Sequence, residues 1–201
     1  STNVFCFTKS MNSSFPIVAA AILNGNASVK NFPIKSAQPD FAFIKILKEL
    51  GVKFELDEAE FVLKVNRTLD LKPIQANLSS SPDLFPVLSV LCAFADGESL
   101  LHSAPQLRYK ESDRIAKSAE LLYKIGIVTE QRTDGIRIFG KSNFLLNDQH
   151  GQSFEFDADH DHRMAMAAGL LMLKGFPVHL KNPKVVNKSF PEFWNILGIQ
   201  L

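Results

Sequence analysis

The sequence predicts an α/β fold, a layered arrangement of helices and strands built from three copies of one βαβαββ unit. The first observation behind this prediction is an apolar helical pattern that runs into a Gly, with a Pro eight residues after that Gly. The copies are residues 17–25 with Pro33, residues 84–97 with Pro105, and residues 164–175 with Pro183. The second observation is the regular alternation of strand-like and helix-like segments around these copies. We therefore expect one globular domain over residues 1–201, with repeats at about 1–68, 69–140 and 141–201.

Each unit is expected to open with a short strand, which the apolar helix follows. The opening strands are residues 4–8, 74–78 and 154–156. The Gly that closes each apolar run supports the helix boundary, because Gly readily adopts the left-handed conformation that ends a helix. A short strand then leads to the Pro. A second, more amphipathic helix comes next, at residues 40–50, 113–125 and 191–197.

A hairpin completes the first two units only. Their second helix ends at Gly51 or Gly126, and two short strands follow, at residues 53–56 with 61–66 and at residues 128–131 with 136–139. Asp134-Gly135 is a typical hairpin turn. The third unit reaches Leu201 before any hairpin, so one sheet edge stays open unless another part of a longer chain covers it. The chain also begins with Ser1 rather than Met, as expected for a piece of a longer protein.

The composition excludes several classes of protein. The chain is 46% hydrophobic and 21% charged, which provides enough apolar material for one sizeable core. Its formal net charge of +1 gives no broad field for nucleic acid or an anionic membrane, so any anion site must be local. No apolar run is long enough to cross a bilayer and no secretory signal opens the chain, so we expect a cytoplasmic protein. Cys6 and Cys92 lie in apolar surroundings, as core cysteines of a reducing compartment do.

Three cations stand at the starts of predicted helices. Ser112 or Asp113 can cap the helix that follows, which puts Arg114 in its first turn. A cation there is unfavourable by up to about 1 kcal/mol, because the helix dipole is positive at that end. Arg163 opens the Ala- and Met-rich helix of the third unit, and Lys188 precedes a helix expected to start at Pro191, with Ser189 or Asn187 as its cap. Since the placement recurs at equivalent ends, we expect the three side chains to form one anion-binding site.

Two carboxylates belong to the same predicted surface. Asp83 starts the apolar helix of the second unit, and Glu111 lies between Lys110 and Ser112. A cation-rich pocket that also holds two carboxylates suits acid–base chemistry on an anionic substrate. Asp83 taken alone can equally be a plain helix cap.

The Asp- and His-rich segment 157–162 has the residue types of a metal site. Arg163 follows it directly, and this positive charge disfavours a divalent ion, so we expect helix capping and support of the site there and no metal. Met164, Met166 and Met172 are expected to pack in the core, and Trp194 to anchor a core or an interface.

Three segments closely resemble signature segments of the enolpyruvyltransferase family of 3-phosphoshikimate 1-carboxyvinyltransferase (EPSP synthase). They are Leu-Arg-Tyr-Lys-Glu-Ser-Asp-Arg-Ile at 107–115, Asp-His-Arg-Met-Ala-Met-Ala at 161–167 and Lys-Ser-Phe-Pro-Glu-Phe at 188–193. The resemblance covers nearly the whole chain. It implies an enolpyruvyltransferase-like fold of two globules, each made of three βαβαββ repeats, of which this chain is the C-terminal globule. It also implies that the missing hairpin comes from the N-terminus of the same protein.

The activity that the resemblance implies is transfer of the enolpyruvyl group of phosphoenolpyruvate to the 5-hydroxyl of shikimate 3-phosphate, with release of phosphate. This is a step of the shikimate pathway of aromatic amino acid and chorismate biosynthesis, in a protein that is a monomer at full length and needs no metal or organic cofactor. Asp83 would orient or deprotonate the 5-hydroxyl. Glu111 would exchange protons with the methylene carbon, with Lys188 as the competing candidate.

The resemblance assigns the substrate contacts as well. Arg114 and Arg163 would hold the carboxylate of phosphoenolpyruvate and Lys188 its phosphate, while Lys110 and Gln106 would reach the shikimate part. Residues 7–14 match the family pattern poorly, and the other globule is absent, so the chain alone is expected to be inactive. Two alternatives stay open: enolpyruvyl transfer to UDP-N-acetylglucosamine, and a non-catalytic anion-binding domain of the same fold.

Overall fold

The computed structural model describes residues 4–8, 14–23, 25–32, 39–66, 68, 70–142 and 153–201. The first repeat contains β1 (Val4–Thr8), α1 (Ser14–Ile22), β2 (Asn26–Lys30), α2 (Pro39–Glu49), β3 (Phe54–Asp57) and β4 (Val62–Val65). The second contains β5 (Gln75–Asn77), the 3₁₀ helix η1 (Pro82–Leu84), α3 (Phe85–Ala93), β6 (Gly97–His102), η2 (Pro105–Tyr109), α4 (Arg114–Lys124), β7 (Val128–Arg132) and β8 (Gly135–Gly140). The third contains β9 (Phe154–Asp157), α5 (His162–Leu173), β10 (Val178–Lys181), η3 (Pro183–Lys188) and α6 (Phe193–Leu197).

The sheets repeat one topology, as the sequence predicts. The first two sheets have the strand orders β1-β2-β4-β3 and β5-β6-β8-β7. In each of them the first two strands are parallel, and the hairpin joins the second strand in antiparallel orientation. The third sheet has β9 and β10 in parallel. No described strand pairs with the other edge of β10, at the place where β2 and β6 receive a hairpin.

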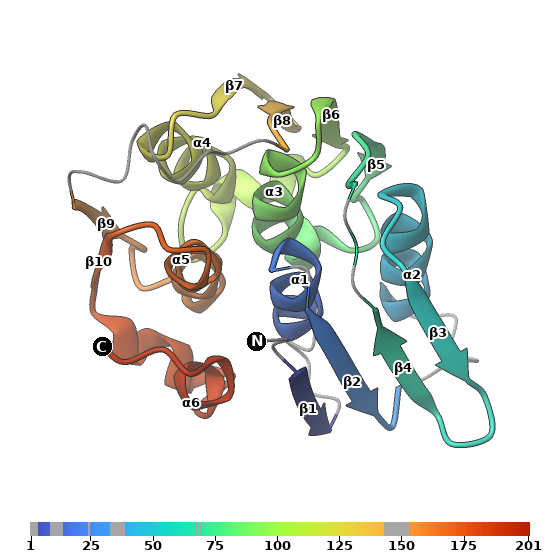
Figure 1. The fold of residues 1–201 in the computed structure, drawn as a ribbon. Helices are drawn as coiled ribbons and strands as arrows, with labels where there is room; N and C mark the ends of the chain where they lie inside the picture. The colour runs from blue at the N-terminus through green and yellow to red at the C-terminus, as the bar shows by residue number, and fades with distance from the viewer. Residues whose placement is uncertain are drawn as a thin grey trace.

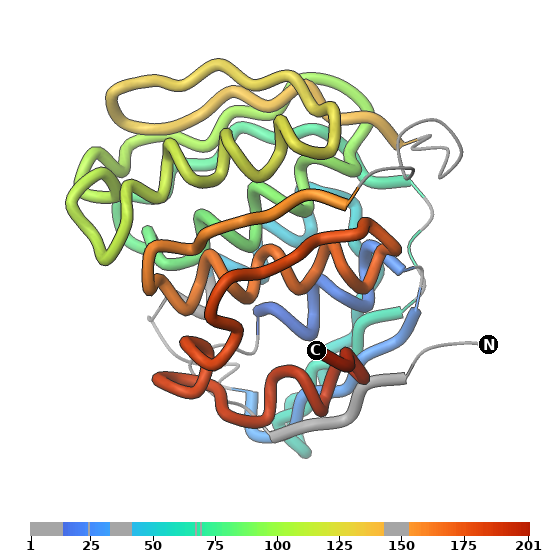
Figure 2. The backbone as a smooth tube through the Cα atoms, turned by 90° about the vertical axis from the view of Figure 1, so that its left-hand side faces the viewer, coloured from blue at the N-terminus to red at the C-terminus, as the bar shows by residue number. Residues whose placement is uncertain are grey.

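Three apolar helices form the centre of the molecule. α1, α3 and α5 pack against one another, and each sheet lies on a different side of this group (Figure 1). All residues of α1 and α3 are buried, because both helices are apolar around their whole circumference. β9 and β10 run across the outer side of α5 (Figure 2). The first helix of each repeat therefore supplies part of the shared core. Residues at the starts of α3 and α5 lie together at one end of this core.

Glycines end several helices as predicted. Gly51, Gly126 and Gly175 lie two positions after the last residues of α2, α4 and α5, with φ values of 77°, 79° and 96°. This left-handed conformation is one that an L side chain disfavours. Gly97 differs from the prediction, because α3 already stops at Ala93 and Gly97 instead opens β6 with φ 121°.

A left-handed residue also follows the second strand of every repeat. Asn31, Ser103 and Asn182 have φ values of 57°, 64° and 49°, and each comes directly after β2, β6 or β10. Asn tolerates this conformation better than most residues, since its short side chain bonds locally. The same backbone turn thus redirects the chain at three equivalent places.

The last helix starts later than predicted. α6 begins at Phe193 with Glu192 as its N-cap, so Pro191 precedes the helix and is not its first residue. Gly169 of α5 allows α6 to approach closely, since a Cβ atom there would lie 2.8 Å from ring atoms of Phe193 and Trp194. Trp194 is buried and donates to the carbonyl of Pro183 at 3.0 Å, which confirms its predicted place in the core.

The structure tests some of the remaining sequence predictions about core residues, and others concern residues outside its described part. Met164, Met166 and Cys92 are buried in the core as expected. The side chain of Cys6, residues 9–13 and Pro33 lie outside the described part of the chain. Among the described residues, no helix has the length and apolar character needed to span a membrane.

Candidate active site

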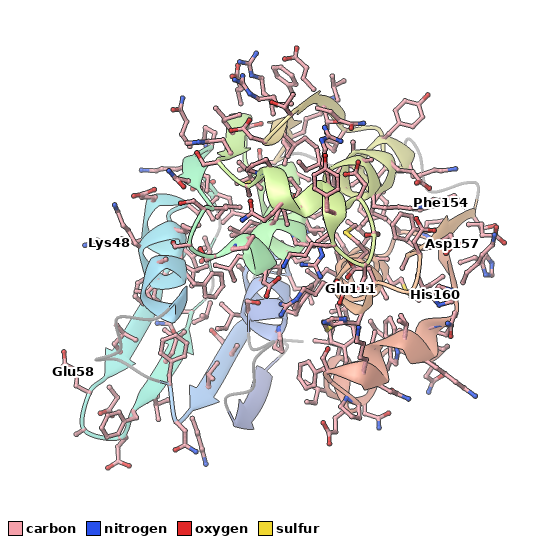
Figure 3. The ribbon with its side chains drawn as sticks, turned by 180° about the vertical axis from the view of Figure 1, so that it is seen from behind. Lys48, Glu58, Glu111, Phe154, Asp157 and His160 are labelled. Carbon is pink, nitrogen blue, oxygen red and sulfur yellow. The ribbon has the colours of Figure 1, made fainter. Side chains whose placement is uncertain are left out.

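An open pocket of about 520 Å³ lies at the N-terminal ends of α3, α4 and α5. Its lining residues are Asp83, Lys110, Glu111, Arg114, His162, Arg163, Lys188 and Ser189. Glu111 occupies the middle of the molecule when it is viewed from behind, whereas Lys48 and Glu58 lie on the outer side of the first repeat (Figure 3). All three predicted cations and both predicted carboxylates therefore converge on one pocket.

Arg114 is the centre of a carboxylate network, which we define as Arg114 with Asp83, Glu111 and Asp161. Its guanidinium is only 1% exposed. Nε and Nη2 donate to the two oxygens of Asp161 at 2.7 and 3.3 Å, Nη1 donates to Asp83 at 2.8 Å, and Nη2 donates to Glu111 at 3.1 Å. Burial alone would lower the pKa of Arg114, but the hydrogen bonds and charges of Asp161 and Asp83 raise it above its ordinary value.

Asp161 combines two tasks at the start of α5. It is fully buried, and its Oδ1 accepts from the backbone N–H groups of Arg163 at 2.9 Å and Met164 at 3.4 Å, as an N-cap does. The same carboxylate binds Arg114 and accepts from the hydroxyl of Ser112 at 3.1 Å. One side chain thus caps α5 and ties the third repeat to the second.

Asp83 lies between two arginines. It does not cap α3, whose N-cap is Leu84; its carboxylate binds Arg114 on one oxygen and Arg163 on the other, at 2.8 and 3.3 Å. Burial would raise the pKa of Asp83, but the charges of Arg163 and Arg114 hold it below its ordinary value. Asp83 is therefore ionised at neutral pH, and its side chain is 49% exposed toward the pocket.

Glu111 and Lys188 face each other at the mouth of the pocket. Nζ of Lys188 donates to Glu111 at 3.2 Å. The pKa of Glu111 is about 2, chiefly because the carboxylate accepts a hydrogen bond from its own backbone N–H; burial opposes this, and Lys188 and Arg114 lower the pKa further. A carboxylate and an ammonium group thus stand in proton-transfer distance beside an opening to solvent.

A family model described as EPSP synthase (3-phosphoshikimate 1-carboxyvinyltransferase) matches residues 2–197. The chain belongs to the EPSP synthase family. Curated relatives named 3-phosphoshikimate 1-carboxyvinyltransferase include one from Clostridium acetobutylicum, 36% identical over 181 residues, and one from Pyrococcus abyssi, 35% identical over 179 residues. These matches cover 90% and 88% of this chain but 40% of each relative, so the chain spans well under half the length of the curated relatives.

Solved structures agree with this family. An EPSP synthase from Acinetobacter baumannii superposes with a TM-score of 0.78 at 27% identity, covering 92% of this chain and 44% of that one. The enolpyruvyl transferase NikO from Streptomyces tendae gives a TM-score of 0.70 at 18% identity over 92% of this chain and 41% of that one, which shows a shared fold.

Two predicted site residues occupy places that differ from the expectation. Lys188 does not stand at a helix N-terminus, because it ends η3 and lies five residues ahead of α6; it reaches the pocket from the C-terminal end of a 3₁₀ helix. Gln106 is exposed in η2 and is not among the residues that line the pocket, so its contact with substrate stays a prediction.

The Asp- and His-rich segment splits into two parts. Asp157 and His160 lie toward the outer edge beside β9, away from Glu111 (Figure 3), whereas Asp161 is buried. Within the described ranges, no three His, Cys, Asp or Glu side chains are grouped as metal ligands would be. The capping role expected for this segment is confirmed at Asp161.

Sequence reasoning missed His162 and Ser112 as members of the site. His162 lines the pocket, and its buried Nδ1 has no hydrogen-bond partner in the described part of the chain. Burial and the charge of Arg163 lower its pKa, so the ring is neutral at pH 7. The available signal was position, since His162 directly precedes Arg163 and Ser112 directly follows Glu111.

We expect the Glu111 carboxyl group to titrate at about pH 2 in the folded chain, against 4.5 for an ordinary Glu. A depressed pKa stabilises the fold fully above the unfolded value, and this contribution is lost as the pH falls from about 4.5 through about 2. Lys188→Met should raise the pKa of Glu111 only partway, because the backbone hydrogen bond remains. Carboxyl-carbon NMR across acidic pH measures both values, and an unshifted Glu111 in the wild type would contradict this electrostatic picture.

Proposed function

We propose that the full-length protein containing this chain transfers the enolpyruvyl group of phosphoenolpyruvate to the 5-hydroxyl of shikimate 3-phosphate and releases phosphate. It would be a cytoplasmic, monomeric enzyme of the shikimate pathway. The observation that carries the proposal is the pocket in which Asp83, Glu111, Arg163 and Lys188 meet around the buried Arg114. Membership of the EPSP synthase family supports the choice of substrates.

The pocket favours an anionic substrate for two reasons. Lys110 and Lys188 are exposed cations on its lining, and Arg163 opens α5. The N-termini of α3, α4 and α5 add the positive ends of three helix dipoles. In this proposal Arg163 and Arg114 bind the carboxylate of phosphoenolpyruvate, which replaces a pocket carboxylate on the Arg114 guanidinium. Lys188 binds the phosphate, and Lys110 with Gln106 reaches the shikimate part.

The reaction needs a base for the hydroxyl and an acid for the methylene carbon. The ionised Asp83 would accept the 5-hydroxyl proton as that oxygen bonds to C2 of phosphoenolpyruvate. Lys188 would supply the proton that turns the methylene group into a methyl group, because Glu111 is ionised before substrate binds. Glu111 would then take a proton from that methyl group while the bond between C2 and the phosphate oxygen breaks. Preorganised cations around the leaving phosphate would stabilise the charge that develops.

One edge of β10 has no strand partner among the described residues, which supports the idea that the remainder of the protein completes this domain. β2 and β6 both pair with a hairpin at the equivalent edge, and an unpaired strand edge is a ready surface for strand addition. Met172, Phe176, Val178 and Ile199 line a shallow pocket of about 460 Å³ beside β10. We propose that a hairpin from the N-terminal part of the same protein pairs with β10, and that the N-terminal domain supplies the other half of the active site.

The full-length protein should convert phosphoenolpyruvate and shikimate 3-phosphate to phosphate and 5-enolpyruvylshikimate 3-phosphate, whereas residues 1–201 alone should show no turnover. The fragment lacks the opposing half of the site, so the substrate would stay open to water. Phosphate release measures the activity, and UDP-N-acetylglucosamine is the comparison acceptor. Hydrogen exchange at the β10 amides should be slow in the full-length protein and fast in the fragment. Turnover by the fragment, or by the full-length protein with UDP-N-acetylglucosamine alone, would contradict the proposal.

A further inference from the structure

Arg108 ties the segment that carries Lys110 and Glu111 to the neighbouring hairpin. Its Nη2 donates to the carbonyl of Arg132 at 2.6 Å and its Nε to the carbonyl of Thr133 at 3.4 Å, both at the turn between β7 and β8. Its Nη1 donates to Asp113 at 2.9 Å. One guanidinium group therefore binds three acceptors on two different elements.

The bond to Asp113 closes the segment into a short loop. Asp113 caps α4 with Oδ1, which accepts from the backbone N–H groups of Ile115 and Ala116 at 3.1 and 3.0 Å. Its other oxygen accepts from Arg108, so the two ends of the segment 108–113 are joined by an ion pair. We call Arg108 and Asp113, with the two carbonyls of the turn, the loop clamp.

The side chains inside this loop provide little anchoring of their own. Tyr109 is 88% exposed and Lys110 is exposed, so neither packs against the core. Glu111 points to the pocket and binds Lys188 and Arg114, both of which belong to the site. The buried Leu107 and Ser112 hold only the two ends. The loop clamp therefore adds, to the pocket contacts of Glu111 and the bond from Ser112 to Asp161, a contact that ties the backbone of this segment to the neighbouring hairpin.

We propose that Arg108 is a positioning residue, which holds residues 109–112 so that Glu111 and Lys110 enter the pocket in the productive geometry. It does not line the pocket itself. The role needs Arg, because a Lys ammonium cannot reach acceptors on both the turn and Asp113 with one rigid planar group. The inference rests on the proposed function for its kinetic consequence, but the geometry of the clamp is independent of the substrate.

The test uses the full-length protein with Arg108→Ala, Arg108→Lys, Asp113→Asn and, as the matched control, Arg132→Ala. The control removes an exposed guanidinium from the same turn but leaves the carbonyl that Arg108 binds. Arg108→Ala should lower kcat about 10- to 100-fold, since a small misplacement of a reacting group is this costly. Arg108→Lys should recover part of the loss. Asp113→Asn keeps a good helix cap. We expect it to lower kcat less than Arg108→Ala does, and this decrease reports the loss of the ion pair with Arg108 alone.

Two further readouts separate positioning from a merely structural role. The double variant Arg108→Ala with Asp113→Asn should be no slower than Arg108→Ala, because both changes remove the same contact. Hydrogen exchange at residues 109–112 should accelerate in Arg108→Ala and stay unchanged in Arg132→Ala. If the wild type turns over and folded Arg108→Ala keeps its kcat, the positioning role is wrong. If the wild type has no activity, the proposed function fails, and unchanged exchange in Arg108→Ala would then overturn the clamp by itself.

Discussion

Replacing Glu111 by Gln in the full-length protein should lower the turnover number roughly 10²- to 10⁴-fold, the range typical of a placed proton-transfer group. Gln keeps the size of the side chain and one acceptor oxygen, but its NH₂ group replaces the other oxygen and it cannot act as a base. The change removes the charge that pairs with Arg114 and Lys188, so some stability should be lost, but the chain should still fold because the Glu111 side chain is 34% exposed. Asp83→Ala should also impair catalysis, since it removes the proposed base for the 5-hydroxyl.

The measurement is steady-state phosphate release together with thermal unfolding of each variant. Glu120→Gln is the matched control, because Glu120, in the second half of α4, also forms an ion pair with a Lys, yet it lies outside the pocket. The control should keep wild-type turnover. Near-wild-type turnover in both Glu111→Gln and Asp83→Ala would refute the acid–base assignment.

Replacing Asp161 by Ala should lower the free energy of unfolding of the chain by about 3–5 kcal/mol, the usual result when one partner of a buried ion pair is removed. Arg114 is 1% exposed and would keep its charge with its closest carboxylate gone. α5 would lose its N-cap at the same time, which costs about 1 kcal/mol. Few other substitutions in this chain combine two losses in one side chain.

Asp161→Asn separates the two contributions. Asn is as good an N-cap as Asp, so the variant retains the cap and loses only the charge that faces Arg114. We therefore expect the free energy of unfolding of Asp161→Asn to lie between those of the wild type and Asp161→Ala. Asp157→Ala provides the control, because Asp157 is half-exposed, accepts from the nearby backbone N–H of Asp159 and forms an ion pair with the exposed Lys181. Urea unfolding measures all three, and equal stabilities for Asp157→Ala and Asp161→Ala would show that the buried pair contributes nothing.

The repeated architecture was predictable from local sequence patterns. The spacing of Gly and Pro and the period of the apolar residues are local properties of the backbone, so they identify each unit without any knowledge of the other units. The ends of α2, α4 and α5 follow from Gly51, Gly126 and Gly175 for the same reason. Convergence of Arg114 and Arg163 was predictable too, because both residues lie at the N-terminal ends of helices, and these ends meet around one pocket.

Which charges meet depends on how distant segments of the chain pack together. Arg114 pairs with Asp161 across 47 positions of sequence, and Arg163 pairs with Asp83 across 80. Such pairs depend on how α3, α4 and α5 pack, which no local pattern encodes. The sequence placed Lys188 at a helix start because Pro191 resembled a first helical residue, whereas packing of Trp194 and Phe193 against Gly169 accompanies a later start. Helix boundaries that depend on such contacts, and ion pairs between distant segments, are set by the energy of the assembled core rather than by neighbouring residues.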